Sequence, residues 1–122
     1  MRLALAAMIV TVTFALAQEH GHPPQDAEIH HQFYKTWKYP KARDSTGTRK
    51  GSCCNLTDCH PTEIKRMGGR WWAKSRDGKS DLQIPEEIME HNQPDPRESP
   101  DGRSHVCVVN RNVICAVLGS AI

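Results

Sequence analysis

Recognisable catalytic motifs are absent from this sequence of 122 residues. The chain has no Ser-His-Asp arrangement in a hydrolase context, no glycine-rich phosphate loop and no His-Glu-x-x-His zinc motif, which are local patterns of common enzyme classes. It also has no Cys-x-x-Cys pair, the motif expected of a catalyst of thiol–disulfide exchange. We therefore expect a protein that is not an enzyme.

Long apolar runs are also scarce, and the one exception stands near the start of the chain. Residues 3–16 carry no charge and follow Arg2, while Ala15 and Ala17 fit an Ala-x-Ala cleavage site. This pattern predicts a secretory signal peptide over residues 1–17, because the run is shorter than the ~20 residues that span a bilayer. No cysteine follows the cut, so a bacterial lipid anchor is not expected. We expect a periplasmic or secreted protein without a membrane span after cleavage.

Large apolar side chains are few in the rest of the chain, and such a thin core leaves a small domain marginally stable. Residues 18–28 are polar and include two prolines, so we expect a flexible segment there. A single domain should follow over residues 29–122. Disulfides can stabilise such a domain in an oxidising compartment. The candidates are Cys53, Cys54, Cys59, Cys107 and Cys115.

Two disulfides leave one of the five cysteines unpaired, and the pairing has two main alternatives. Cys107 and Cys115 could bridge each other across a hairpin. Alternatively, each could bridge back to the cysteines at 53–59. We favour the second arrangement, because a bridge across a long loop restricts the unfolded chain more.

A short helix is predicted over residues 27–38. Ile29, Phe33 and Trp37 recur every four residues, which places them on one helical face. Asp26 suits the start of this helix and Pro40 its end.

A three-stranded meander is predicted over residues 62–84. Gly68-Gly69 suits a two-residue hairpin turn, which sets Met67 opposite Arg70, Lys65 opposite Trp72 and Ile64 opposite Ala73. Alternation along the strands then turns Ile64, Trp71 and Ala73 toward the core. A second turn at Asp77-Gly78 leads to a strand over 80–84, and residues 85–90 fit one or two helical turns.

A second hairpin is predicted at the end of the chain, with strands over 105–109 and 113–118. A three-residue loop at 110–112 would pair Val109 with Val113 and Cys107 with Cys115. The predicted fold class is therefore α+β: a short N-terminal helix packs on a small antiparallel sheet built from the meander and this hairpin, and disulfides lock the whole.

Charge is unevenly distributed along the chain. Residues 35–79 carry 12 basic and four acidic side chains, whereas residues 80–122 carry three basic and seven acidic ones. The basic segment could bind an anionic partner, or it could face the acidic segment within the fold. The predicted register gathers a basic, aromatic face that could contact a sugar ring or an anionic polymer. Its members are Lys65, Arg70, Trp72 and Lys74.

Metal handling is the alternative function that the sequence offers. Copper or zinc could bind to the unpaired cysteine together with histidine nitrogens. The candidate histidines are His20, His22, His60 and His105. Otherwise we expect no cofactor.

Several spaced motifs resemble a group of small exported proteins predicted from proteobacterial genomes. These motifs are Cys53-Cys54-x-x-x-Asp58-Cys59, Trp71-Trp72, Ser99-Pro100-Asp101-Gly102-Arg103-x-His105-x-Cys107, and Cys115. The resemblance covers residues 33–115 and implies a bacterial periplasmic or secreted setting, with no assigned activity. The basic segment and Trp72 lead us to expect a non-enzymatic binding or interaction module whose partner is an anionic envelope polymer or an envelope protein, and we expect no nucleic-acid partner.

Overall fold

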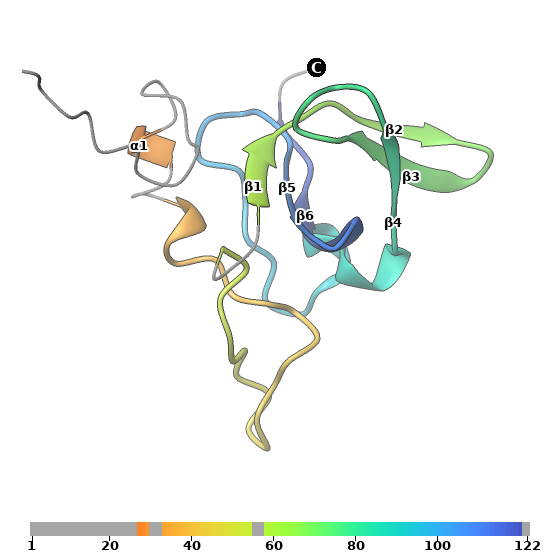
Figure 1. Ribbon diagram of the computed structural model, residues 1–122. Coiled ribbons are helices and arrows are strands. Elements are labelled where there is room, and N and C mark those ends of the chain that lie inside the picture. The colour runs from red at the N-terminus through yellow and green to blue at the C-terminus, as the bar shows by residue number, and fades with distance from the viewer. Residues whose placement is uncertain (1–26, 30–32, 55–57, 121–122) are drawn as a thin grey trace, which may run out of the picture.

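The computed structural model describes residues 27–29, 33–54 and 58–120. Within these ranges the chain forms two three-stranded antiparallel sheets. Figure 1 shows the order of the strands along the chain. One sheet has the order β1-β5-β6, with bounds Asp58–Pro61, His105–Val109 and Asn112–Val117. The other has the order β2-β3-β4, with bounds Ile64–Met67, Arg70–Lys74 and Asp81–Ile84. The predicted signal peptide at 1–17 lies outside the described residues, as does most of the predicted flexible segment at 18–28.

The meander prediction is confirmed in both strands and register. Ile64 pairs with Ala73, Lys65 with Trp72 and Met67 with Arg70. Gly68 and Gly69 have φ angles of 60° and 75°, which glycine adopts without steric cost and which a two-residue hairpin turn requires. The helical turns expected after β4 are two 3-10 segments, η3 (Glu86–Ile88) and η4 (Glu90–Asn92).

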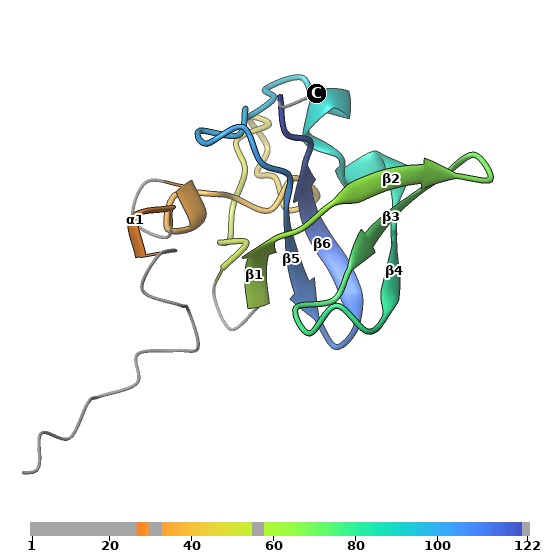
Figure 2. The same cartoon turned by 90° about the horizontal axis from the view of Figure 1, so that it is seen from above.

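The meander and the C-terminal hairpin form two sheets rather than the single sheet predicted. The β2-β3-β4 sheet lies against the β5–β6 hairpin (Figure 2), and their facing side chains form a common core. That core contains Ala73, Leu82, Ile84, Ile88, Met89, Val106, Val113 and Ala116. Two sheets form because each segment has a face of small or branched apolar residues, and packing these faces together removes both from water.

The C-terminal hairpin has a tighter turn than predicted. Only Asn110 and Arg111 form the turn, with φ angles of 47° and 65°, and Val109 pairs with Asn112. A β-bulge then adds Ile114, so that Cys107 still pairs with Cys115. The bulge has a consequence for packing, because in a regular strand Val113 and Cys115 would share one face. Here Cys115 joins the core around the disulfides, while Val113 joins the core between the sheets.

Two disulfides connect the hairpin to the segment before the meander. Cys53 bonds to Cys115, and Cys59 bonds to Cys107. This confirms the favoured pairing and leaves Cys54 as the free thiol. Strand β1, which begins at Asp58, pairs with β5. The Cys59–Cys107 bridge joins directly paired residues of these two strands.

The predicted helix over residues 27–38 is not supported. The described part of this segment contains α1 (Ala27–Ile29) and a short π-helical turn at Phe33 and Tyr34. Turn hydrogen bonds run from Thr36 to Phe33 and from Trp37 to Tyr34. Lys38 then bridges Ser52 in an antiparallel pair. Ile29, Phe33 and Trp37 are nevertheless buried, together with Tyr34, against the two disulfides. Short helices are unstable on their own. The adjacent rings of Phe33 and Tyr34 are both buried, so the buried side chains of this segment do not lie on a single helical face.

Candidate binding face

The β2–β3 hairpin projects from the body of the molecule (Figures 1 and 2). Its inner side faces the core through Ala73, which is buried, and through the partly buried Ile64 and Trp71. Because side chains alternate along a strand, the confirmed register places the predicted basic and aromatic residues together on the outer side. We call this surface the outer face. It consists of Lys65, Met67, Arg70, Trp72 and Lys74.

Met67 is the member of the outer face that was not predicted from the sequence. Its side chain is 48% exposed, and it is the one large hydrophobic residue described as exposed within residues 27–29, 33–54 and 58–120. The register contained the signal, since Met67 stands opposite Arg70 and two residues from Lys65. The outer face therefore combines apolar and cationic side chains.

Trp72 is held in a fixed orientation on the outer face. It is partly buried, and its indole Nε1 donates a hydrogen bond to the Met67 carbonyl oxygen at 3.2 Å. Buried indoles normally find such a partner. The ring therefore occupies a defined place on the hairpin beside Lys65, its cross-strand neighbour.

The cations of the outer face are only partly neutralised. Lys74 contacts Asp81 at 2.6 Å and Lys65 contacts Glu63 at 3.7 Å, with about half of each side chain or more exposed. Arg70 donates to the Gln83 amide oxygen at 3.4 Å, and within the described residues it has no ion pair. Exposed ion pairs are worth little, so an anionic ligand could replace these partners at low cost.

Residues of the basic segment also pair with the acidic segment within the fold, which was the second of the two possibilities for the uneven charge. Arg49 donates to both carboxylate oxygens of Glu90 at 2.8 and 2.9 Å, and both side chains are buried. Hydrogen bonding to Glu90 raises the pKa of Arg49. The Arg43 guanidinium, together with Arg49, holds the pKa of the Asp95 carboxyl well below its usual range. Some cations of the basic segment therefore stabilise the fold through ion pairs with the acidic segment. Other cations of the basic segment lie on the outer face.

The four candidate metal ligands are not brought together in the described structure. His20 and His22 lie outside the described residues. The register pairs His60 with Val106, so His60 and His105 point to opposite faces of their sheet. His60 Nε2 lies 2.9 Å from the Lys74 carbonyl oxygen. Among residues 27–29, 33–54 and 58–120, no three His, Cys, Asp or Glu side chains are grouped to hold a metal ion.

His105 is already engaged through both ring nitrogens. Its Nδ1 is 2.7 Å from the Tyr34 hydroxyl, and its Nε2 is 2.8 Å from an Asp101 carboxylate oxygen. Partial burial acts to raise the pKa of the Asp101 carboxyl, but hydrogen bonds from His105, Arg103 and Ser99 outweigh it and hold that pKa well below its usual range. This chain of hydrogen bonds anchors the loop before β5 to the core around the disulfides.

Burial raises the pKa of the Cys54 thiol. The free thiol is therefore mostly protonated at neutral pH, and a protonated thiol is a poor nucleophile and a poor metal ligand.

Comparisons with known proteins give no match to this chain, whether with family models, with curated proteins or with solved structures. In the part of the chain that the structure describes, no helix has the length and apolar character needed to cross a membrane.

Proposed function

We propose that this protein is a non-enzymatic binding module that acts outside the cytoplasm and holds an anionic glycan on its outer face. The observation that carries the proposal is the grouping of Trp72 and Met67 with Lys65 and Arg70 on one side of a projecting hairpin. Charge complementarity selects a polyanion as the partner.

The chemistry of the outer face suits a chain of acidic sugars. An indole offers a flat apolar surface on which the apolar side of a sugar ring can stack. A guanidinium pairs with a carboxylate through two parallel hydrogen bonds, and Arg70 has no competing carboxylate within the described residues. Lys65 and Lys74 add positive charge on either side, which attracts a polyanion over a distance of about 10 Å at 0.1 M salt.

The two disulfides support a location outside the cytoplasm. Disulfides form and persist in oxidising compartments and are rare in the reducing cytosol. The pairs Cys53–Cys115 and Cys59–Cys107 fix the sheet against which the meander packs. A module of this kind would keep its binding face in order in the periplasm or outside the cell.

Calorimetric titration with alginate, a linear polyuronate, tests the proposal. We expect Trp72→Ala and Arg70→Gln each to weaken binding about tenfold or more, which corresponds to ~1.4 kcal/mol. Lys50→Gln is the matched control, because it removes one exposed positive charge from the loop at 41–52 rather than from the outer face. Dextran, a neutral glycan, should not bind.

Three results would contradict the proposal. The first is an absence of alginate binding at low salt. The second is an equal loss of affinity in Lys50→Gln and Arg70→Gln, which would indicate a response to net charge alone. The third is unchanged binding by Trp72→Ala, which would remove the aromatic contact on which the proposal depends.

A further inference from the structure

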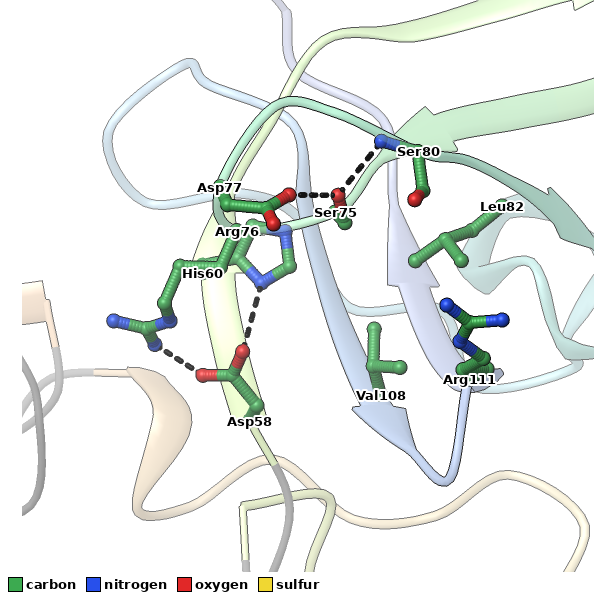
Figure 3. Close-up of a pocket in the computed structure, with 9 residues that line it drawn as sticks. All are labelled: Asp58, His60, Ser75, Arg76, Asp77, Ser80, Leu82, Val108 and Arg111. Atoms are coloured by element: carbon green, nitrogen blue, oxygen red, sulfur yellow. Dashed lines mark hydrogen bonds and ion pairs between the residues drawn. The ribbon is translucent and has the colours of Figure 1, made fainter.

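A cleft of about 410 Å³ opens between the two sheets, on the side of the β2-β3-β4 sheet opposite the outer face. Figure 3 shows its walls. Strand β1 and the turn between β3 and β4 form one wall, and the turn between β5 and β6 forms the other. Leu82 from one sheet and Val108 from the other line its apolar part. Nothing in the proposed glycan binding uses this cleft.

A cation without a partner stands on one wall. Arg111 is exposed at the tip of the β5–β6 hairpin, and within the described residues its guanidinium makes no hydrogen bond or ion pair. Its backbone is fixed by the two-residue turn, where its φ angle is 65°. The turn therefore presents a positive charge at the edge of the apolar surface of Leu82 and Val108.

An anion without a cationic partner stands on the opposite wall. Asp77 accepts hydrogen bonds from the Ser75 hydroxyl at 2.6 Å and from the Lys79 backbone at 3.0 Å. These bonds lower the pKa of Asp77, so its carboxylate is ionised at neutral pH. Within the described residues Asp77 has no ion pair. Asp58, in contrast, is neutralised by Arg76, which also donates to the Cys59 carbonyl oxygen.

The wall that carries Asp77 also has an acceptor without a donor. His60 is 5% exposed, and its Nε2 lies 2.9 Å from a carbonyl oxygen, so Nε2 is the donor nitrogen. In the neutral ring Nδ1 is then an acceptor, and no hydrogen-bonding partner for it exists among the described residues. The Asp58 carboxylate lies 3.8 Å from Nδ1. This nitrogen is buried, and the Arg76 guanidinium on the same wall is paired with Asp58. Asp77 is therefore the charged group of this wall that has no oppositely charged partner among the described residues.

We infer that the cleft binds a small zwitterion with an apolar body, which is the chemistry of a free apolar amino acid. The ammonium group, with three N–H donors, faces the Asp77 carboxylate. The carboxylate faces the guanidinium of Arg111. The two charged groups of such an amino acid are attached to one carbon, and its apolar side chain covers Leu82 and Val108, which line the apolar part of the cleft.

Nitrogen-15 NMR titration with three matched compounds tests this inference. Leucine carries both charges, 4-methylpentanoate lacks the ammonium group, and 3-methylbutylamine lacks the carboxylate. We expect leucine to bind with a dissociation constant of about 1 mM or tighter and to shift the amide signals of residues 75–80 and 108–112. Each analogue should bind about tenfold more weakly or worse, because one charged hydrogen-bonding group is left without its partner.

Two variants and two controls decide between specific and general binding. Arg111→Gln should weaken leucine and 4-methylpentanoate binding about tenfold, whereas Asp77→Asn should weaken leucine and 3-methylbutylamine binding by a similar factor. The side-chain oxygen of the introduced asparagine would still accept the turn hydrogen bonds, so the loop should keep its shape. Lys50→Gln and Trp72→Ala should leave leucine binding unchanged. No shift of cleft signals at about 10 mM leucine, or equal binding of leucine and both analogues, would overturn the inference.

Discussion

Replacing Glu90 with glutamine should destabilise the protein strongly, although the change is nearly isosteric. The Glu90 side chain is 1% exposed and accepts four hydrogen bonds. One carboxylate oxygen accepts from the Trp37 indole at 2.9 Å and from Arg49 at 2.8 Å. The other accepts from Arg49 at 2.9 Å and from the Arg97 backbone N–H at 2.8 Å. Glu90 therefore joins the loop at 38–52 to the segment that precedes β5.

The magnitude follows from this geometry. A glutamine amide has one oxygen and one NH₂ group, so whichever way the amide turns, two of the four donors face another donor. The buried Arg49 also loses the carboxylate that it contacts through two nitrogens, and it keeps only the half-exposed Asp95 as an ion-pair partner. Breaking a buried ion pair by removing one charge costs about 3–5 kcal/mol, and the remaining contact of Arg49 with the half-exposed Asp95 places the expected cost near the lower end of that range. We expect a loss of this size in the free energy of unfolding.

Glu87→Gln provides the matched control. Glu87 lies three residues earlier and contacts Lys41 at 3.3 Å, but its side chain is 59% exposed. Exposed ion pairs contribute little, so this variant should unfold like the unmodified protein. Urea unfolding without reductant, followed by tryptophan fluorescence, measures both variants. Equal midpoints for Glu90→Gln and Glu87→Gln would refute the reasoning.

Two further predictions concern the disulfides and the response to acid. In a Cys54→Ala background, replacing both Cys53 and Cys115 with alanine should lower the free energy of unfolding by about 3 kcal/mol. The Cys59–Cys107 bridge stays intact, so the bridge that is removed closes a loop of only about 15 residues. Urea unfolding checks this, and a loss near zero would contradict it. The pKa of Asp101 is lowered by folding, so its stabilising contribution is present above the ordinary pKa of 3.8 and is lost as the pH falls below about 4. Asp101→Asn should be less stable at pH 7 and should lose less stability on acidification, and parallel stability–pH curves for the two proteins would contradict this.

Local signals in the sequence were sufficient for the meander and its outer face. Gly68-Gly69 defines a two-residue turn, and that turn alone sets Lys65 opposite Trp72. Alternation then determines which side chains face outward. The four predicted residues of the outer face therefore lie on one surface, because every step depends on residues close together in the chain.

Long-range packing determined the features that the sequence did not reveal. Strand β1 contains only four residues and ends in Pro61, so it shows no clear alternation, and it forms because β5 offers a free edge. The two-residue turn and the bulge at Ile114 together place Cys115 in the core around the disulfides and Val113 in the core between the sheets. Tyr34 is buried through its contact with His105, which the helical pattern at 27–38 did not include.

The cleft also depends on distant parts of the chain. Asp77 and Arg111 each stood in a segment that the sequence identified only as a turn. Their approach requires the two sheets to pack together, and the separation of the sheets was not predicted. A turn residue that carries a charge without a local partner is the signal that could have identified them.

The most direct test of the proposed binding face is nitrogen-15 NMR titration with short alginate oligomers. We predict that the Trp72 indole N–H signal and the backbone signals of β2 and β3 shift together, with those of Lys65 and Arg70 among the largest changes. Signals from the loop at 41–52 should stay in place. Shifts confined to that loop, or no shifts at low salt, would show that the outer face is not a binding site for anionic glycans.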